Sequence, residues 1–174
     1  MKKIIGIIAI CLMATVSCLA QYNTTYSNKY GGNIGTSSTS RSNNGVSTTN
    51  YYNRYGGSMG SSTTRQNNKG GYSTNYYNNL GGSQGSATTR SNYNGSYSTN
   101  YYDKVGNNVV SAKTYKNYND SYTTNYYNQY GSKIGSSTTI SNNRGGTTTT
   151  FYNEYGNNIG TSASSKKTTI MELY

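Results

Sequence analysis

A period of 25 residues, kept without insertion or deletion from Thr24 to Leu173, constrains this chain more than any other feature. A typical copy, Thr49 to Ser73, reads TNYYNRYGGSMGSSTTRQNNKGGYS. A disordered spacer has no physical reason to hold its length so strictly, so the period predicts a repeated structural unit. The six repeats span 24–48, 49–73, 74–98, 99–123, 124–148 and 149–173, and the last carries a divergent C-terminal cap.

A secretory leader is expected ahead of the repeats. Lys2 and Lys3 precede an apolar stretch over 4–16, and small residues lead to Ala20. This pattern is typical of a signal peptide over 1–20 that is cleaved after Ala20, which leaves 21–23 as a short N-terminal segment. The stretch is shorter than the roughly 20 residues of a membrane-spanning helix. We therefore expect an extracellular or cell-surface protein with no membrane span.

A lipoprotein signal is the alternative interpretation of the same segment. Cys18 would then be acylated and would anchor the protein to a membrane. Thr15 stands where such signals usually have leucine, which favours the first interpretation. Under the first interpretation both cysteines of the chain, Cys11 and Cys18, are removed with the leader, and the mature chain has no disulfide.

Each repeat divides into two strand-like runs and two turn-like runs. The first run, as in 72–77, is rich in Thr and Tyr, which favour a pleated strand. It ends at Asn-x-Tyr-Gly-Gly, where glycine can adopt a positive φ at little cost. The second run, as in 59–65, is closed by the turn-like segment 67–70. No window shows a helical apolar period, so the sequence predicts an all-β protein.

Two all-β architectures fit this alternation of strands and turns. The first is an elongated antiparallel meander of six tandem β-hairpins, with a glycine in each tight turn. The second is a β-solenoid in which equivalent columns stack. The turn chemistry favours the meander, and the strict period favours the solenoid. The turn glycines are Gly31, Gly56, Gly81, Gly106, Gly131 and Gly156.

Strand alternation gives both faces of this sheet a polar and aromatic character. In the first strand, neighbouring tyrosines point to opposite faces. They serve either in place of an aliphatic core or as a platform for assembly or for a ligand. The platform residues are Tyr51, Tyr76, Tyr101 and Tyr126 in one column, and Tyr52, Tyr77, Tyr102 and Tyr127 in the next.

The charge of the chain is strongly basic, with 15 Lys and Arg against 4 Asp and Glu and a formal charge of +11. Basic residues gather at the end of the second strand, where they form either a stripe that contacts anionic polymers or a charged edge that prevents uncontrolled pairing. A secreted protein meets anionic or polysaccharide surface polymers before any intracellular nucleic acid. The basic residues of this stripe are Arg41, Arg65, Arg90 and Lys116.

Catalysis is not expected from this composition. The chain has no His, and its four carboxylates, Asp103, Asp120, Glu154 and Glu172, fall in unrelated columns of the repeat. No pair therefore recurs at a spacing suited to acid and base catalysis. The same scarcity gives no metal-binding set and no cofactor site.

One segment carries a resemblance to known repeats. The pattern Tyr-x-Asn-x-x-Gly-x-x-Ile-Gly-Ser over Tyr126 to Ser136 resembles the hairpin repeats of bacterial surface and cell-wall proteins, including MORN-type repeats. The Gly, Asn, Ser and Tyr-rich array behind a leader is similar in style to curlin, the subunit of a secreted bacterial amyloid. It departs from curlin in repeat length and lacks regular Gln ladders. The resemblance implies fibre assembly and assigns no residue a role.

These observations together predict a secreted structural or adhesive protein of the cell surface or matrix. Self-association into fibres through exposed strand edges is the leading mechanism. One alternative is a monomeric module that binds glycans or cell wall through its Tyr columns. A second alternative is a disordered spacer.

Overall fold

The computed structural model of the chain describes residues 22–42, 44–68, 70–142 and 145–166. These residues form an all-β fold, which confirms the predicted class, and no helix occurs among them. The described residues therefore contain no helix that is long and apolar enough to cross a membrane. The strands are β1 (Tyr22–Asn28), β2 (Asn33–Arg41), β3 (Ser47–Asn53), β4 (Ser58–Gln66), β5 (Tyr72–Tyr77), β6 (Ser83–Ser91), β7 (Tyr97–Tyr102), β8 (Asn108–Lys116), β9 (Tyr122–Asn128), β10 (Lys133–Ser141), β11 (Thr147–Asn153) and β12 (Asn158–Lys166).

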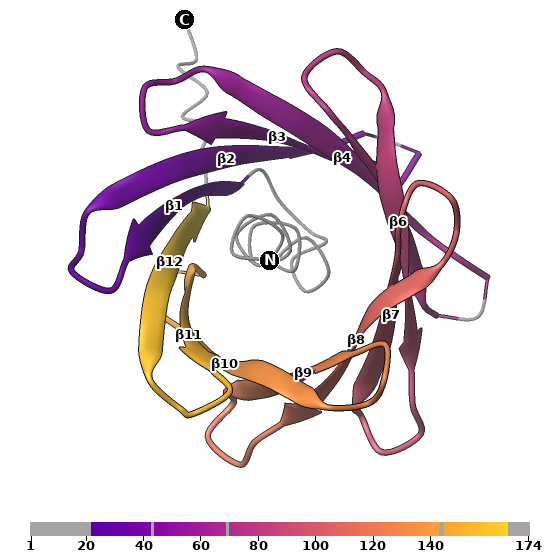
Figure 1. The fold of residues 1–174 in the computed structure, drawn as a ribbon, viewed down its shortest axis with the longest axis vertical. Coiled ribbons are helices and arrows are strands. Elements are labelled where there is room, and N and C mark those ends of the chain that lie inside the picture. Colours follow the sequence, from indigo (N-terminus) through magenta and orange to yellow (C-terminus); the bar gives the residue numbers. More distant parts are fainter. Residues whose placement is uncertain (1–21, 43, 69, 143–144, 167–174) are drawn as a thin grey trace, which may run out of the picture.

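The sheet is a closed antiparallel barrel, so the predictions of an open meander and of a solenoid were both wrong (Figure 1). Each strand pairs with its sequence neighbours, and β1 also pairs with β12 from Tyr22↔Lys166 to Asn28↔Gly160. Closure satisfies the backbone groups that an open meander leaves unpaired at its two edges. The first and last repeats therefore lie side by side.

The pairing register moves steadily around the barrel. Tyr26 pairs with Gly35, which pairs with Asn53, two residues beyond the equivalent Tyr51. This stagger is the shear that a sheet needs in order to close with tilted strands.

Because alternate connections lie at opposite ends, the barrel has two ends of different sequence. We call them the intra-repeat end, with turns 29–32, 54–57, 79–82, 104–107, 129–132 and 154–157, and the inter-repeat end, with turns 42–46, 67–71, 92–96, 117–121 and 142–146.

β-Bulges occur within the repeats, close to the intra-repeat end. In each of the six hairpins the register shifts between the two tyrosine columns or their equivalents, as at Tyr51/Tyr52, and the second strand carries one extra residue there, such as Met59. A bulge increases the local twist and bends the strand. Gly60 occupies the bulge of β4 with φ +135°, and a Cβ there would lie 2.2 Å from the carbonyl oxygen of Tyr77. Curvature repeated in each hairpin is one physical reason for closure over an extended sheet.

One face of the sheet is buried and the other is more exposed. In β4, Gly60, Ser62 and Thr64 are buried, whereas Met59 and Arg65 are exposed. A single closed layer crowds side chains on its concave side and spreads them on its convex side. The buried face is therefore the inner face of the barrel, and the second face is the outer one.

The inner face is built largely from hydrogen-bonded Thr, Ser and Tyr in place of an aliphatic core. Thr64 and Thr74 bond through their hydroxyls at 2.9 Å, and the Tyr51 hydroxyl bonds to Ser62 at 3.1 Å. No buried side-chain nitrogen or oxygen of the described residues lacks a partner. A small apolar cluster on β5 to β8 supplements this network and consists of Tyr76, Ala87, Tyr101, Val110 and Ala112.

Candidate functional site

The turns of the intra-repeat end hold one large side chain each in a fixed position. In the first turn, the Gly31 N–H donates to the Asn28 carbonyl at 3.0 Å, and the Asn28 side-chain oxygen accepts from the N–H groups of Tyr30 and Gly32 at 2.9 Å. We call this pair of bonds the bracket, and the residue just before each of the other turns repeats it: Asn53, Asn78, Asp103, Asn128 and Asn153. The tip residue is therefore held on a rigid backbone.

The glycines expected in these turns lie one residue after the tip. Their φ values, between +81° and +99°, require a left-handed backbone that glycine adopts without strain. Space beside them is open, because a Cβ at these positions would meet no atom within 4 Å. The glycine therefore serves the backbone conformation rather than close packing. The residues are Gly31, Gly56, Gly81, Gly106, Gly131 and Gly156.

The tip residues form a ring of exposed large side chains around the intra-repeat end. Each keeps 77–89% of its surface exposed. Because a large side chain is exposed at the same place in every repeat, we take this set as a candidate interaction surface. We call this set the tip ring: Tyr30, Tyr55, Leu80, Val105, Tyr130 and Tyr155.

Barrel closure orders the tip ring into two arcs. Because β1 pairs with β12, the hairpin of Tyr155 lies beside the hairpin of Tyr30. Tyr130 and Tyr55 flank that pair, so four tyrosines form one continuous arc. Adjacent tips are two strands apart, which corresponds to roughly 10 Å. Leu80 and Val105 form the second arc.

Charged side chains contact three of the four tyrosines of this arc. The Lys29 ammonium lies 4.8 Å from the centre of the Tyr30 ring, and the Arg54 guanidinium lies 4.6 Å from the centre of the Tyr55 ring. These are cation–π contacts, which also restrict the orientation of each ring. In the hairpin of Tyr155, a hydrogen bond to the Glu154 carboxylate raises the pKa of the phenol. Each of these rings therefore has a charged neighbour on its own turn.

The first predicted platform column lies on the inner face. Tyr51, Tyr76 and Tyr101 are only 5–8% exposed, and Tyr126 is partly buried. Burial raises the pKa of Tyr126 to about 12, while its hydroxyl bonds to Ser137 at 2.7 Å. The ring faces of these tyrosines are occupied by the barrel interior. Their role is that of the core, and the expected ligand platform does not lie in this column.

The second predicted column lies on the outer face. Its members, Tyr52, Tyr77, Tyr102 and Tyr127, are half-buried. The sequence interpretation missed the tip ring, whose tyrosines are far more exposed than this column, and it also missed Tyr93 and Tyr118, which are fully exposed in two inter-repeat turns. Recurrence of a large side chain directly before the turn glycine was the signal that could have located it.

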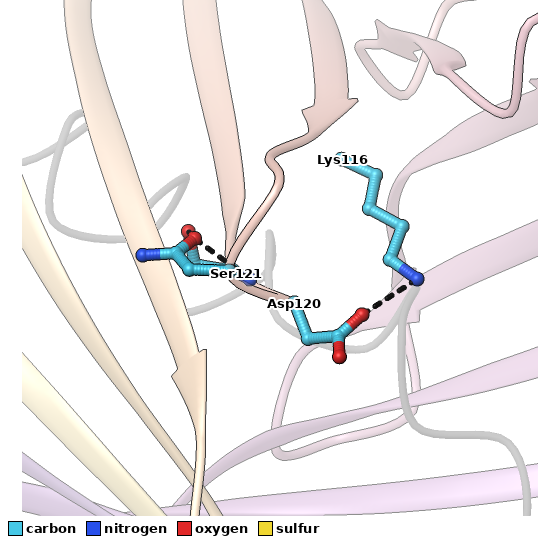
Figure 2. Close-up of polar contacts among 4 residues, drawn as sticks. Lys116, Asp120 and Ser121 are labelled. Atoms are coloured by element: carbon cyan, nitrogen blue, oxygen red, sulfur yellow. Dashed lines mark hydrogen bonds and ion pairs between the residues drawn. The ribbon is translucent and has the colours of Figure 1, made fainter.

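The predicted basic stripe gathers at the inter-repeat end, but on two faces. Arg65 and Arg90 follow the inner Thr64 and Thr89 and so point outward. Arg41 and Lys116 lie one position later in the repeat, so strand alternation places them on the other face of the sheet. Lys116 pairs with Asp120 at 2.7 Å, beside the buried Ser121 (Figure 2). This contact lowers the pKa of the Asp120 carboxyl and raises that of the Lys116 ammonium.

No group of three or more His, Cys, Asp or Glu side chains that could hold a metal ion occurs in the part of the chain described by the structure. The Asp103 carboxylate is used by its own turn, where the Asn107 amide and N–H hold its pKa below the ordinary value. No family model matches the chain, and a search of curated proteins finds no relative.

Proposed function

We propose that this protein is a secreted adhesive module of a cell surface or extracellular matrix that binds polysaccharide through the tip ring. The observation that carries the proposal is the exposure of six large tip side chains on rigid turns at one end of the barrel. A side chain fixed before binding loses little conformational entropy when a ligand arrives. The tip ring therefore has the properties of a preformed binding surface.

The chemistry of tyrosine suits a sugar chain. A tyrosine offers a flat apolar face and a hydroxyl, with few rotatable bonds to immobilise. Its face packs on the C–H face of a pyranose ring, and its hydroxyl bonds to sugar hydroxyls. The four-tyrosine arc repeats this unit at intervals of roughly 10 Å, twice the separation of neighbouring strands. Several contacts of modest strength along one linear chain then add through avidity.

Barrel closure favours the binding form of this adhesive role over growth by strand pairing. Every described strand has a partner on both sides, so no sheet edge is left as a template for another chain. Fibre growth would have to proceed through the barrel ends or the outer face. The tip ring offers a soluble or surface polymer a site without opening the sheet.

The test compares two sets of tip substitutions for binding to insoluble cell-wall polysaccharide and to a soluble β-glucan. Replacing Tyr30, Tyr55, Tyr130 and Tyr155 together by alanine should weaken binding by at least 10-fold. The matched variant with Leu80→Ala and Val105→Ala should bind nearly as well as the parent. Equal binding by all three proteins, or no binding by the parent, would contradict the proposal.

Sedimentation velocity on the same samples separates the remaining interpretations. A compact monomer agrees with a binding module. Growth to very large species would support the assembly form of the adhesive role. A monomer with an expanded radius would support a disordered spacer.

A further inference from the structure

The outer face at the inter-repeat end carries a second surface, separate from the tip ring. Arg90 on β6 pairs with Ser98 on β7, and Ser98 pairs with Lys113 on β8. Residues paired across neighbouring strands point to the same face, so one serine separates these two cations. The distance across two strands is roughly 10 Å. Arg90 follows the last inner residue of β6, Lys113 lies between two inner residues of β8, and both side chains are exposed.

The surface continues toward β4 through Arg65. Ser73, its neighbour on β5, pairs in turn with Thr88, two residues before Arg90 on β6. Arg65 also lines an open cleft of about 330 Å³ together with Asn44, Gly45, Val46 and Gln66.

Arg41 ends β2, just before the turn that supplies Asn44, Gly45 and Val46 to this cleft, and one of its guanidinium nitrogens lies 3.8 Å from the position of a Cβ on Gly45.

Negative charge is scarce around this surface. Among the described residues the carboxylates are Asp103, Asp120 and Glu154. Asp103 and Glu154 lie in turns of the opposite end, and Asp120 is paired with Lys116. Arg65, Arg90 and Lys113 have no carboxylate among the described residues within ion-pairing distance. The surface is thus a row of cations without local neutralisation, which attracts a polymer of opposite charge.

We propose that this outer surface, formed by Arg65, Arg90 and Lys113, binds an acidic polysaccharide through its carboxylates. Guanidinium groups bind carboxylates with two parallel hydrogen bonds, and the spacing between cations leaves room for uncharged sugar hydroxyls at the intervening Ser73 and Ser98. A single-stranded nucleic acid would instead require aromatic side chains between the cations, on which successive bases stack. Polar residues occupy those positions. Exposed tyrosines lie at the border of the row rather than between its cations: Tyr115 on β8, and Tyr93 and Tyr118 in the inter-repeat turns that follow β6 and β8.

This surface and the tip ring lie at opposite ends of the barrel. The protein then joins a neutral polysaccharide at one end to an acidic polysaccharide at the other. The site for the acidic polysaccharide does not depend on the tip ring, because none of its residues belongs to an intra-repeat turn.

The experiment measures binding of the purified protein to polygalacturonate across a range of salt concentrations. Arg65→Gln together with Arg90→Gln should weaken binding by about 10-fold or more at low salt, as expected for the loss of two charge-assisted contacts. It should also reduce the slope of log K against log salt by about two. Circular dichroism and thermal unfolding should match the parent, because both side chains are exposed.

The matched control is Lys104→Gln together with Lys133→Gln, which removes the same charge from the intra-repeat end. It should leave polygalacturonate binding within about 2-fold of the parent, since long-range attraction is screened over about 10 Å. An equal loss in both variants would overturn the proposal, because net charge alone would then explain binding. Tighter binding to oligo-dT than to polygalacturonate would also overturn it and would assign the surface to single-stranded nucleic acid.

Discussion

Tyr51 and Tyr55 stand four residues apart in one hairpin and occupy opposite environments. Tyr51 is 6% exposed on the inner face, with its hydroxyl bonded to Ser62, whereas Tyr55 is 79% exposed at the tip of a turn. The same type of side chain forms part of the core at position 51 and is exposed to solvent at position 55. The barrel interior and the intra-repeat rim therefore place tyrosine in different physical environments, one packed and the other open to solvent.

The largest expected effect is on the interior. Tyr51→Ala removes a buried ring and leaves a cavity, so we expect a loss of about 3–5 kcal/mol in the free energy of unfolding. Urea unfolding followed by circular dichroism measures it. Tyr55→Ala is the control and should change stability by less than about 0.5 kcal/mol. Similar losses in the two variants would contradict the division between interior and rim.

The bulge beside the interior ring should be nearly as sensitive. Gly60→Ala places a Cβ 2.2 Å from the Tyr77 carbonyl oxygen at φ +135°, and we expect a cost of about 2–4 kcal/mol from overpacking and backbone strain. Gly56→Ala at the rim meets open space at φ +82° and should cost only about 1–2 kcal/mol. Thermal unfolding of both variants ranks them. The reverse ranking would show that the bulge accommodates a side chain, as it does at Val110 in the fourth repeat.

The rim depends on its asparagine bracket. Asn53→Ala removes the acceptor for the N–H groups of Tyr55 and Gly57 and should cost about 0.5–2 kcal/mol, by analogy with the loss of a helix cap. Amide hydrogen exchange at Gly57 should accelerate. Asn53→Asp is the control, because Asp103 makes the same two backbone bonds in the fourth repeat. Faster exchange in both variants would mean that the bracket needs the amide itself.

The smallest effect is expected at the opposite rim. Asp120 has φ +55°, whereas the equivalent position of the other four inter-repeat turns is glycine, so Asp120→Gly should stabilise the protein by about 0.5–1 kcal/mol. The variant loses the exposed pair with Lys116. Because the folded pKa of Asp120 lies below its ordinary 3.8, that pair contributes above this pH and is lost as pH falls through the lowered value. The stabilisation by Asp120→Gly, measured by urea unfolding, should therefore be larger at a pH below the pKa of Asp120 than at neutral pH. A smaller stabilisation at the lower pH would contradict the prediction.

Local structure was predictable from the sequence because its signals lie within a few residues of one another. The strand runs, the turn glycines such as Gly56 and the hairpin unit follow from alternation and turn chemistry. The tip ring was missed because exposure of Tyr55 depends on how the turn leaves the sheet. The placement of Tyr51 on a core face was one of two alternatives that alternation left open.

By itself, the sequence determined the all-β class, the register of the repeats and the position of each turn, since backbone conformation at a turn depends on neighbouring residues. Only the tertiary structure decided which face is buried, that β1 pairs with β12, and which tips and cations become neighbours. Tyr22 of β1 pairs with Lys166 of β12, although the two residues stand at opposite ends of the described sequence. That contact results from twist, bulges and stagger accumulated over every hairpin, together with the free energy gained when both sheet edges find partners.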